Sequence, residues 1–374
     1  MSAVDPPDAG PPLSELSSVF RVYETRQVGD RLVYYGEPLA PQETILERVW
    51  PPFRERGYEV TLTQQTGEHV LVAEPIEVGV EGVPWTNIGL LLATIVSTLY
   101  AGSMWYYVRD PLGNPVETVL TVWPFAAAVL GVLGIHELGH YVMSRYHDVD
   151  ATLPYFIPMP TIIGTMGAVI KMKGQMPDRK ALFDIGVAGP LAGLVATVVV
   201  TAIGLAMEPI AVPQWVLDSP NTMQVQFGYP PLFQAIAFLM GQPVGYADPS
   251  LAVNPVVFGG WVGMFVTFLN LLPVGQLDGG HIVRSLVGKR QATVAAIVPA
   301  VLFGLAGYLY YFEDVGSAVG LWGFWGLLAL VFAFVGPAHP IHEQPLDDKR
   351  RLLGVFTLIL GVLCFTPVPI QIAM

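Results

Sequence analysis

Two histidines and a glutamate lie within five residues of one another in an otherwise apolar segment, GVLGIHELGHYVM, at residues 131–143. His136 and His140 are four residues apart, so on a helix they share one face and both imidazoles can bind one metal ion. Glu137 projects from the neighbouring position, close enough to take a proton from a metal-bound water. Neutral imidazoles bind Zn²⁺ well, and the metal lowers the pKa of its water to about 7. The pattern therefore predicts a zinc site that activates water.

A catalytic zinc ion usually takes three protein ligands, so a third ligand is needed. A third histidine six residues after the second would complete a common pattern, but Tyr146 stands there. No glutamate occurs between Glu137 and Glu208, and we expect Glu208 on the opposite side of the membrane. Asp278, in the sequence QLDGGH, lies at the end of a later apolar segment and at the expected depth of the histidines. Asp278 is the favoured third ligand, and His281 is a rival.

Each of these residues also has a purely structural interpretation. The histidines and glutamate of HELGH can be buried groups that hydrogen-bond neighbouring helices, but three ionisable residues in five positions of a membrane span are costly. Taken alone, Asp278 fits a glycine-rich turn or a helix N-cap. His147 and Asp148 follow the basic Arg145, so we expect them at the membrane interface. The sequence HPIHEQP at residues 339–345 offers a second metal site, although a solvated loop is the favoured interpretation.

The composition is that of a membrane protein that crosses the bilayer several times. Hydrophobic residues make up 53% of the 374 residues and charged residues 13%, against about 25% charged in an ordinary soluble domain. The net charge of −12 argues against nucleic-acid binding. The single cysteine, Cys364, excludes an intrachain disulfide, and the first residues lack the basic and apolar regions of a secretory signal peptide.

The N-terminal part reads as a disordered lead-in followed by a small domain. Residues 1–18 are rich in Pro, Ser and Asp and are expected to be disordered. Residues 19–82 are expected to form a small cytoplasmic α+β domain. It would consist of two alternating strands, a helix that ends at Pro51 and Pro52, and a hairpin.

Seven apolar segments follow, and they predict an all-α polytopic membrane protein with about six or seven transmembrane helices. Their approximate bounds are 87–107, 119–144, 181–206, 251–273, 291–312, 317–335 and 351–370. Residues 161–174 alternate like a strand and predict a short membrane-associated β segment. Gly189 and Gly193 lie four residues apart in GVAGPLAG, a spacing typical of close helix packing.

Basic residues predict the orientation. Lysines and arginines gather in alternate loops, and the long loop at 207–250 has none. The positive-inside rule therefore places the N-terminus and the opening of the active site in the cytoplasm of a multi-pass protein of the cell membrane.

Three motifs together resemble the site-2 protease family of intramembrane zinc metalloproteases. They are HELGH, FDIGVAGPLAG at 183–193 and NLLPVGQLDGGH at 270–281, in the order that the family shows. The similarity covers residues 87–310, the expected metalloprotease core, and leaves residues 311–374 as additional C-terminal transmembrane helices. The small N-terminal domain and these extra helices are most like the archaeal, cyanobacterial and plastid branch of the family.

The resemblance implies a role for each site residue. His136, His140 and Asp278 would bind one Zn²⁺ per active site, and Glu137 would be the catalytic base. Asn270 stands where the family has an asparagine that holds the backbone of the substrate.

The expected function is that of a zinc metalloendopeptidase that cuts a peptide bond in or near the transmembrane helix of a membrane-protein substrate, in regulated intramembrane proteolysis. Its expected partners are that substrate and the lipid bilayer, without nucleic acid; the sequence leaves the substrate and the oligomeric state open. Two alternatives stay open as well. One is a membrane transporter, which gives Glu137 no task, and the other is a non-catalytic metal-binding scaffold.

Overall fold

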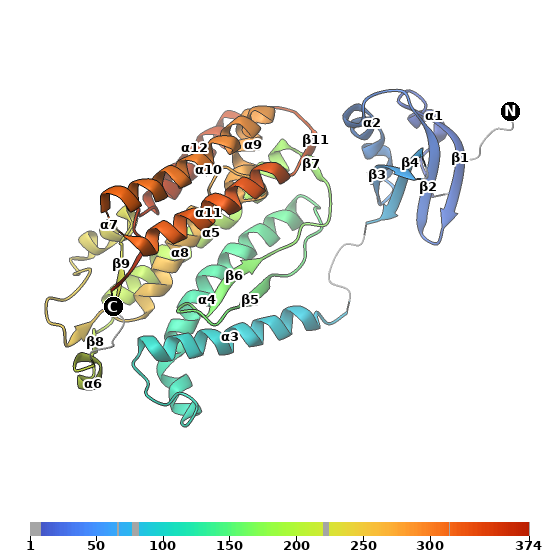
Figure 1. The fold of residues 1–374 in the computed structure, drawn as a ribbon. Coiled ribbons are helices and arrows are strands. Elements are labelled where there is room, and N and C mark those ends of the chain that lie inside the picture. The colour runs from blue at the N-terminus through green and yellow to red at the C-terminus, as the bar shows by residue number, and fades with distance from the viewer. Residues whose placement is uncertain (1–8, 66, 77–81, 220–223, 314, 374) are drawn as a thin grey trace.

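The computed structural model describes residues 9–65, 67–76, 82–219, 224–313 and 315–373. A small unit of mixed helix and strand comes first, and a larger helical part follows from Trp85 onward (Figure 1). The elements of the first unit are α1 (Leu13–Leu16), β1 (Phe20–Val28), β2 (Arg31–Pro38), α2 (Gln42–Arg54), β3 (Tyr58–Gln65) and β4 (Glu68–Pro75). The four strands form one antiparallel sheet in the order β1-β2-β4-β3, as expected for two hairpins.

The core of this unit lies between α2 and the sheet. Ile45, Val49 and Phe53 project from one face of α2 and are fully buried against Leu32 and Leu71 of the sheet. These positions are four residues apart on the helix, and the strand residues belong to the inward-facing set, so each element buries one face.

Two expectations for the first unit are wrong. The lead-in is not wholly irregular, because Leu13–Leu16 form a short helix and Leu16 is fully buried in the core; residues 1–8 lie outside the described residues. Helix α2 does not end at Pro51 and Pro52 but continues to Arg54. Proline removes a backbone donor but has a helical φ, and the burial of Phe53 one residue later offsets the missing hydrogen bonds.

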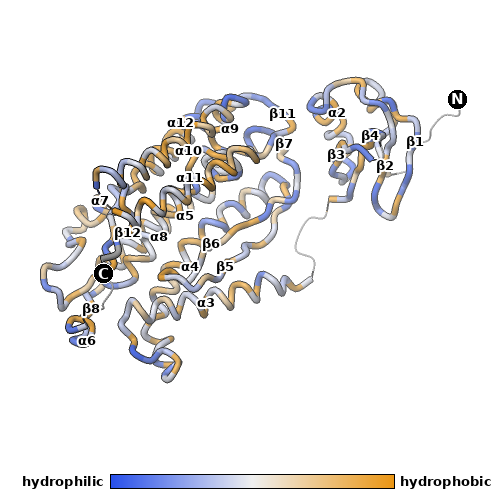
Figure 2. Tube along the Cα trace, viewed as in Figure 1, coloured by the Kyte–Doolittle hydropathy of each residue, from blue (hydrophilic) through white to orange (hydrophobic). Residues whose placement is uncertain are grey.

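The second part is a bundle of helices. They are α3 (Trp85–Trp105), α4 (Pro115–Tyr146), α5 (Arg179–Ala206), α6 (Gln214–Leu217), α7 (Pro231–Met240), α8 (Val256–Asn270), α9 (Asp278–Val287), α10 (Gln291–Tyr308), α11 (Gly316–Val335) and α12 (Asp348–Leu363), with the short helical turns η1 (Gly288–Arg290) and η2 (Leu309–Glu313). Figure 2 shows hydrophobic residues along most of the length of α10 and α11.

Five stretches of helix in the described residues are long and apolar enough to cross a membrane: Trp85–Trp105, Pro115–Tyr146, Arg179–Ala206, Asp278–Glu313 and Gly316–Val335. The protein is therefore a polytopic helical membrane protein. The expected spans at 251–273 and 351–370 are the helices α8, of 15 residues, and α12, of 16 residues, which are shorter than the roughly 20 residues of a typical span. The total of six or seven spans stays a prediction, as do the domain boundaries.

Helices α4, α5 and α8 approach one another closely because glycines line their contacts. A Cβ atom added at Gly139 of α4 would lie 2.6 Å from the carbonyl oxygen of Ala188 on α5. On α8, a Cβ at Gly260 would lie 2.0 Å from Thr201 Oγ1. The glycine backbones therefore lie directly against atoms of the neighbouring helix, as small residues allow in membrane proteins.

Short paired strands occur in the segments that connect the helices. The expected strand within residues 161–174 is present as β6 (Thr165–Val169), which pairs antiparallel with β5 (Tyr155–Pro158). The association of this segment with the membrane stays a prediction. The segment lies beside α3, where Trp105 Nε1 donates a hydrogen bond of 2.7 Å to the carbonyl oxygen of Ile162. The other strands are β7 (Met176–Asp178) with β11 (Pro340–His342), β8 (Ile210–Ala211) with β10 (Leu251–Ala252), and β9 (Gln224–Phe227) with β12 (Ile370–Ala373).

The N-terminal unit contacts the loops around β7 and β11. The Nε2 atom of Gln175 donates a hydrogen bond of 3.0 Å to the carbonyl oxygen of Val60, and its backbone N–H donates one of 2.6 Å to Glu59 Oε1. Burial raises the pKa of the Glu59 carboxyl above its ordinary value. Ile341 of β11 packs against the core of the unit. The unit is thus attached to the segment that leads into α5.

Phe53→Ala should unfold the N-terminal unit and leave the helical bundle intact. Removing a fully buried phenylalanine costs about 3–5 kcal/mol, which is most of the stability of so small a unit. Limited proteolysis of the full chain should then cut within residues 9–76. Leu39→Ala is the control, because Leu39 is 46% exposed and should have little effect. Equal resistance of the two variants would contradict the packing described for Phe53.

Candidate metal centre

Three side chains from distant parts of the chain converge in the helical bundle. Helix α4 presents His136 and His140 on one face, with their Nε2 atoms 3.1 Å apart. Asp278, the first residue of α9, places one carboxylate oxygen 3.3 Å from His136 Nε2 and the other 3.2 Å from His140 Nε2. One ligand atom from each residue lies within 4.8 Å of the other two. The structure thus brings together the three residues that the sequence predicted as metal ligands.

The hydrogen bonds of His140 favour metal binding. Its Nδ1 atom lies 2.8 Å from the carbonyl oxygen of Ile185 on α5, and a carbonyl can only accept. Nδ1 therefore carries the proton, and Nε2 presents its lone pair to His136 and Asp278. A backbone carbonyl that orients a histidine in this way is a common second partner of a metal ligand.

The charge distribution of the cluster also fits a cation. Oδ2 of Asp278 is buried and, within the described part of the chain, has no hydrogen-bond partner. A carboxylate oxygen and two imidazole nitrogens that face one another are all electron-rich, so they repel one another unless a cation or a proton lies among them. Two histidines and one aspartate are also a donor set that suits zinc.

Glycines of α5 make room for both imidazole rings. A Cβ atom at Gly189 would lie 2.0 Å from His140 Nε2, and one at Gly193 would lie 2.9 Å from His136 Nδ1. The rings therefore lie directly on the backbone of α5. This confirms the predicted close packing at these two glycines and shows that their packing partners are the histidines themselves.

Glu137 lies beside the cluster and is 6% exposed. Its carboxylate lies near the backbone N–H of Ile170, the residue that follows β6. The β segment therefore touches the predicted base.

Asn270 is the last residue of α8, and its Nδ2 atom lies 3.2 Å from His136 Nε2. The structure thus places this asparagine at the cluster. Its predicted contact with a substrate backbone stays a prediction.

The other histidines lie elsewhere. His281 is buried on α9 but does not belong to the group of ligand atoms within 4.8 Å. His147 pairs with Asp184 at 3.0 Å, and His342 lies 3.8 Å from Glu47 of the N-terminal unit. Within the described residues, only His136, His140 and Asp278 form such a group of three possible ligands, so HPIHEQP does not form a second one there.

Sequence reasoning missed two partners of the site, the carbonyl of Ile185 and the N–H of Ile170. Both are backbone groups, so the residue type gives no signal for them. Asp184 was part of the quoted FDIG motif, but no role was predicted for it.

Comparisons with known proteins agree on the chemistry. Residues 124–307 match the family model described as Peptidase family M50. The chain is 29% identical over 343 residues to the "Probable zinc metalloprotease EGY2, chloroplastic" of Arabidopsis thaliana, covering 89% of this chain and 59% of that protein. It is 32% identical over 255 residues to "Probable zinc metalloprotease EGY1, chloroplastic" of the same plant, covering 66% of this chain and 43% of the relative. The chain thus spans about half the length of these relatives. No solved structure matches significantly.

Gly189→Ala should weaken metal binding about tenfold or more, because the new methyl group would occupy the position of the His140 ring. Metal content after dialysis against buffers of defined free Zn²⁺ measures the effect. Gly131→Ala is the matched control, since an added Cβ at Gly131 of α4 meets nothing within 4 Å. Equal metal content in both variants would show that the ring does not depend on this space.

Proposed function

This chain belongs to the site-2 protease family, Peptidase family M50, within its plastid-like branch, and we propose that it is an intramembrane zinc metalloendopeptidase. It would hydrolyse a peptide bond in or near the transmembrane helix of a membrane-protein substrate. The observation that carries this proposal is the convergence of His136, His140 and Asp278 beside the buried carboxylate of Glu137.

In this proposal His136, His140 and Asp278 hold one Zn²⁺. When bound, zinc supplies a Lewis acid that polarises the scissile carbonyl and makes water more acidic. The Ile185 carbonyl keeps the proton of His140 on Nδ1, so the ligand nitrogen stays free.

Glu137 moves the protons. Its carboxylate takes a proton from the attacking water and then gives it to the nitrogen of the leaving amine. The backbone N–H of Ile170 lies near this carboxylate. Asn270, whose amide lies at the cluster, would donate a hydrogen bond from Nδ2 to a backbone carbonyl of the substrate.

A helical substrate must unwind before cleavage, because its carbonyls are engaged in hydrogen bonds within the helix. We propose that the unwound segment pairs with the open edge of β6. The N–H of Thr152 donates to the carbonyl of Lys171, and the N–H of Lys171 donates to Thr152 Oγ1, so the backbone N–H and C=O groups of Lys171 point toward β5. Because these groups alternate in direction along a strand, those of Ile170 and Ala168 point toward the opposite edge. The N–H of Ile170 on that edge lies near the carboxylate of Glu137, so a substrate strand paired there would lie beside the proposed base.

We further propose a location in the cell membrane, with the N-terminus and the opening of the site in the cytoplasm. The basic residues of the expected inner loops support this orientation. Substrates would be membrane proteins cut in regulated proteolysis. A transporter and a non-catalytic scaffold are less favoured, because neither gives a task to the buried Glu137 beside three ligand atoms.

Glu137→Gln should abolish cleavage, with a fall in rate of about 10²- to 10⁴-fold, because glutamine cannot take up the proton. Zinc content should stay at the wild-type level, since Glu137 does not belong to the group of three ligand atoms. The measurement uses purified protein with a model single-span substrate. Wild-type protein with zinc that leaves the substrate intact, or a glutamine variant that cleaves normally, would refute the peptidase function.

Ala168→Pro should slow cleavage about five- to tenfold, because proline removes an N–H on the edge where the substrate strand would pair. Zinc content should not change. Ala168→Ser retains the N–H and is the matched control. Wild-type cleavage by the proline variant would rule out pairing at this edge and leave the metal chemistry untouched.

A further inference from the structure

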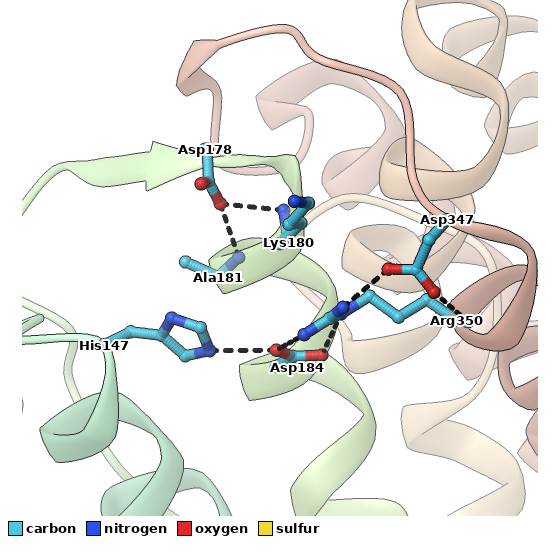
Figure 3. Close-up of polar contacts among 7 residues, drawn as sticks. All are labelled: His147, Asp178, Lys180, Ala181, Asp184, Asp347 and Arg350. Atoms are coloured by element: carbon cyan, nitrogen blue, oxygen red, sulfur yellow. Dashed lines mark hydrogen bonds and ion pairs between the residues drawn. The ribbon is translucent and has the colours of Figure 1, made fainter.

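Asp184 lies near the start of α5 and joins three helices. It receives two hydrogen bonds from Arg350 of α12, from Nε at 2.8 Å and from Nη2 at 2.7 Å, in a bidentate pair. Oδ2 of the same carboxylate lies 3.0 Å from His147 Nε2 at the end of α4 (Figure 3). The Asp184 side chain is 14% exposed. This cluster lies outside the metal group and has no part in the chemistry described above.

The cluster is linked to the metal ligands through two neighbouring residues of α5. Asp184 contacts His147, and Ile185 contacts His140 through its carbonyl. His140 and His147 are seven residues apart, which is about two turns of α4. Two contacts spaced by two turns fix both the rotation of α4 and its position along α5. The Ile185 carbonyl, which accepts the hydrogen bond of His140, therefore lies in the same part of α5 that Asp184 anchors.

Helix α12 holds this segment from the other side. Arg350 also donates from Nη1 to Asp347 Oδ2 at 2.6 Å, and Asp347 caps α12 by accepting from the Arg350 backbone N–H at 3.1 Å (Figure 3). The guanidinium is thus fixed between its own helix start and α5. Phe183, the neighbour of Asp184, packs against Gly354 of α12, where an added Cβ would lie 2.8 Å from the ring.

The geometry differs from that of an ordinary surface ion pair. An exposed, singly bonded pair contributes little because water screens it. Here the contact is bidentate and the carboxylate is mostly buried, so removing Arg350 leaves a charge that water cannot fully solvate.

We propose that Asp184 and Arg350 are positioning residues of the metal centre, through which α12 holds α5 in the register that presents the Ile185 carbonyl to His140. Helix α12 lies outside residues 124–307, the part that matches the family model. Helix α12 would therefore contribute to the geometry of the site. The inference deepens the proposed function. An effect of these residues on cleavage rests on that function, whereas their effect on metal binding does not.

A double-mutant cycle in the full-length protein tests the inference, with Co²⁺ as the probe. Asp184→Asn, Arg350→Gln and the double variant are titrated with Co²⁺, and affinity and the visible absorption spectrum of the bound ion are recorded. Each single variant should lose about tenfold in affinity and show an altered spectrum, as expected when a ligand loses its orienting partner. The total loss of affinity in the double variant should also be about tenfold, not a hundredfold, because both changes break the same interaction.

Arg351→Gln is the matched control. Arg351 is the next residue on α12, and its pair with Asp348 is exposed, so its removal should change neither affinity nor spectrum. Arg350→Lys keeps the charge without the bidentate geometry and should recover part of the loss.

Additive losses in the double variant, or wild-type affinity and spectrum in Arg350→Gln, would overturn the inference. Wild-type protein that binds no Co²⁺ would overturn it as well. Co²⁺ binding that follows the cycle in a protein without peptidase activity would refute the proposed function alone and support the positioning role.

Discussion

The cost of placing imidazoles and carboxylates inside an apolar helix bundle is the constraint on which the rest of the structure depends. Such groups lose the hydration that they have in water, so they persist only where other partners replace it. Here the partners are close. His136, His140 and Asp278 face one another within 4.8 Å, the carbonyl oxygen of Ile185 lies 2.8 Å from His140 Nδ1, and the N–H of Ile170 lies near Glu137. Oδ2 of Asp278 differs from these groups, because it has no hydrogen-bond partner among the described residues.

Contacts this short between groups on different helices require the helix backbones to lie close together. Glycine costs about 1 kcal/mol relative to alanine in a helix, yet it recurs where α4, α5 and α8 meet. At Gly139, Gly189, Gly193 and Gly260 an added Cβ would lie within 3 Å of a neighbouring atom. The lost helix propensity is offset by these close contacts, and at Gly189 and Gly193 the contact is with the imidazole rings of His140 and His136. The same glycines of α5 therefore determine both how closely the helices pack and where the two imidazole rings lie.

The sequence was sufficient to predict that His136, His140 and Asp278 lie together and that the chain has several long apolar helices, because those features depend on side-chain type and helical spacing. His136 and His140 had to share a face, and Asp278 followed from the lack of a nearer ligand together with the family resemblance. Backbone partners such as the Ile185 carbonyl could not be predicted, because every residue has a backbone carbonyl and the residue type does not mark the one that is used. Helix α2 passes two prolines because of tertiary burial of Phe53, and Leu16 is ordered for the same reason, neither of which local composition reveals.

The break between α8 and α9 explains how Asn270 and Asp278 reach the same nitrogen. In a continuous helix these residues would be about 12 Å apart along the axis. Instead Asn270 Nδ2 lies 3.2 Å and Asp278 Oδ2 3.3 Å from His136 Nε2. The chain turns back at Gly275, whose φ of +50° suits glycine. Irregular backbone at membrane depth must be enclosed by protein, and Val274 is fully buried. The short length of α8 is therefore what lets Asp278 meet the histidines of α4.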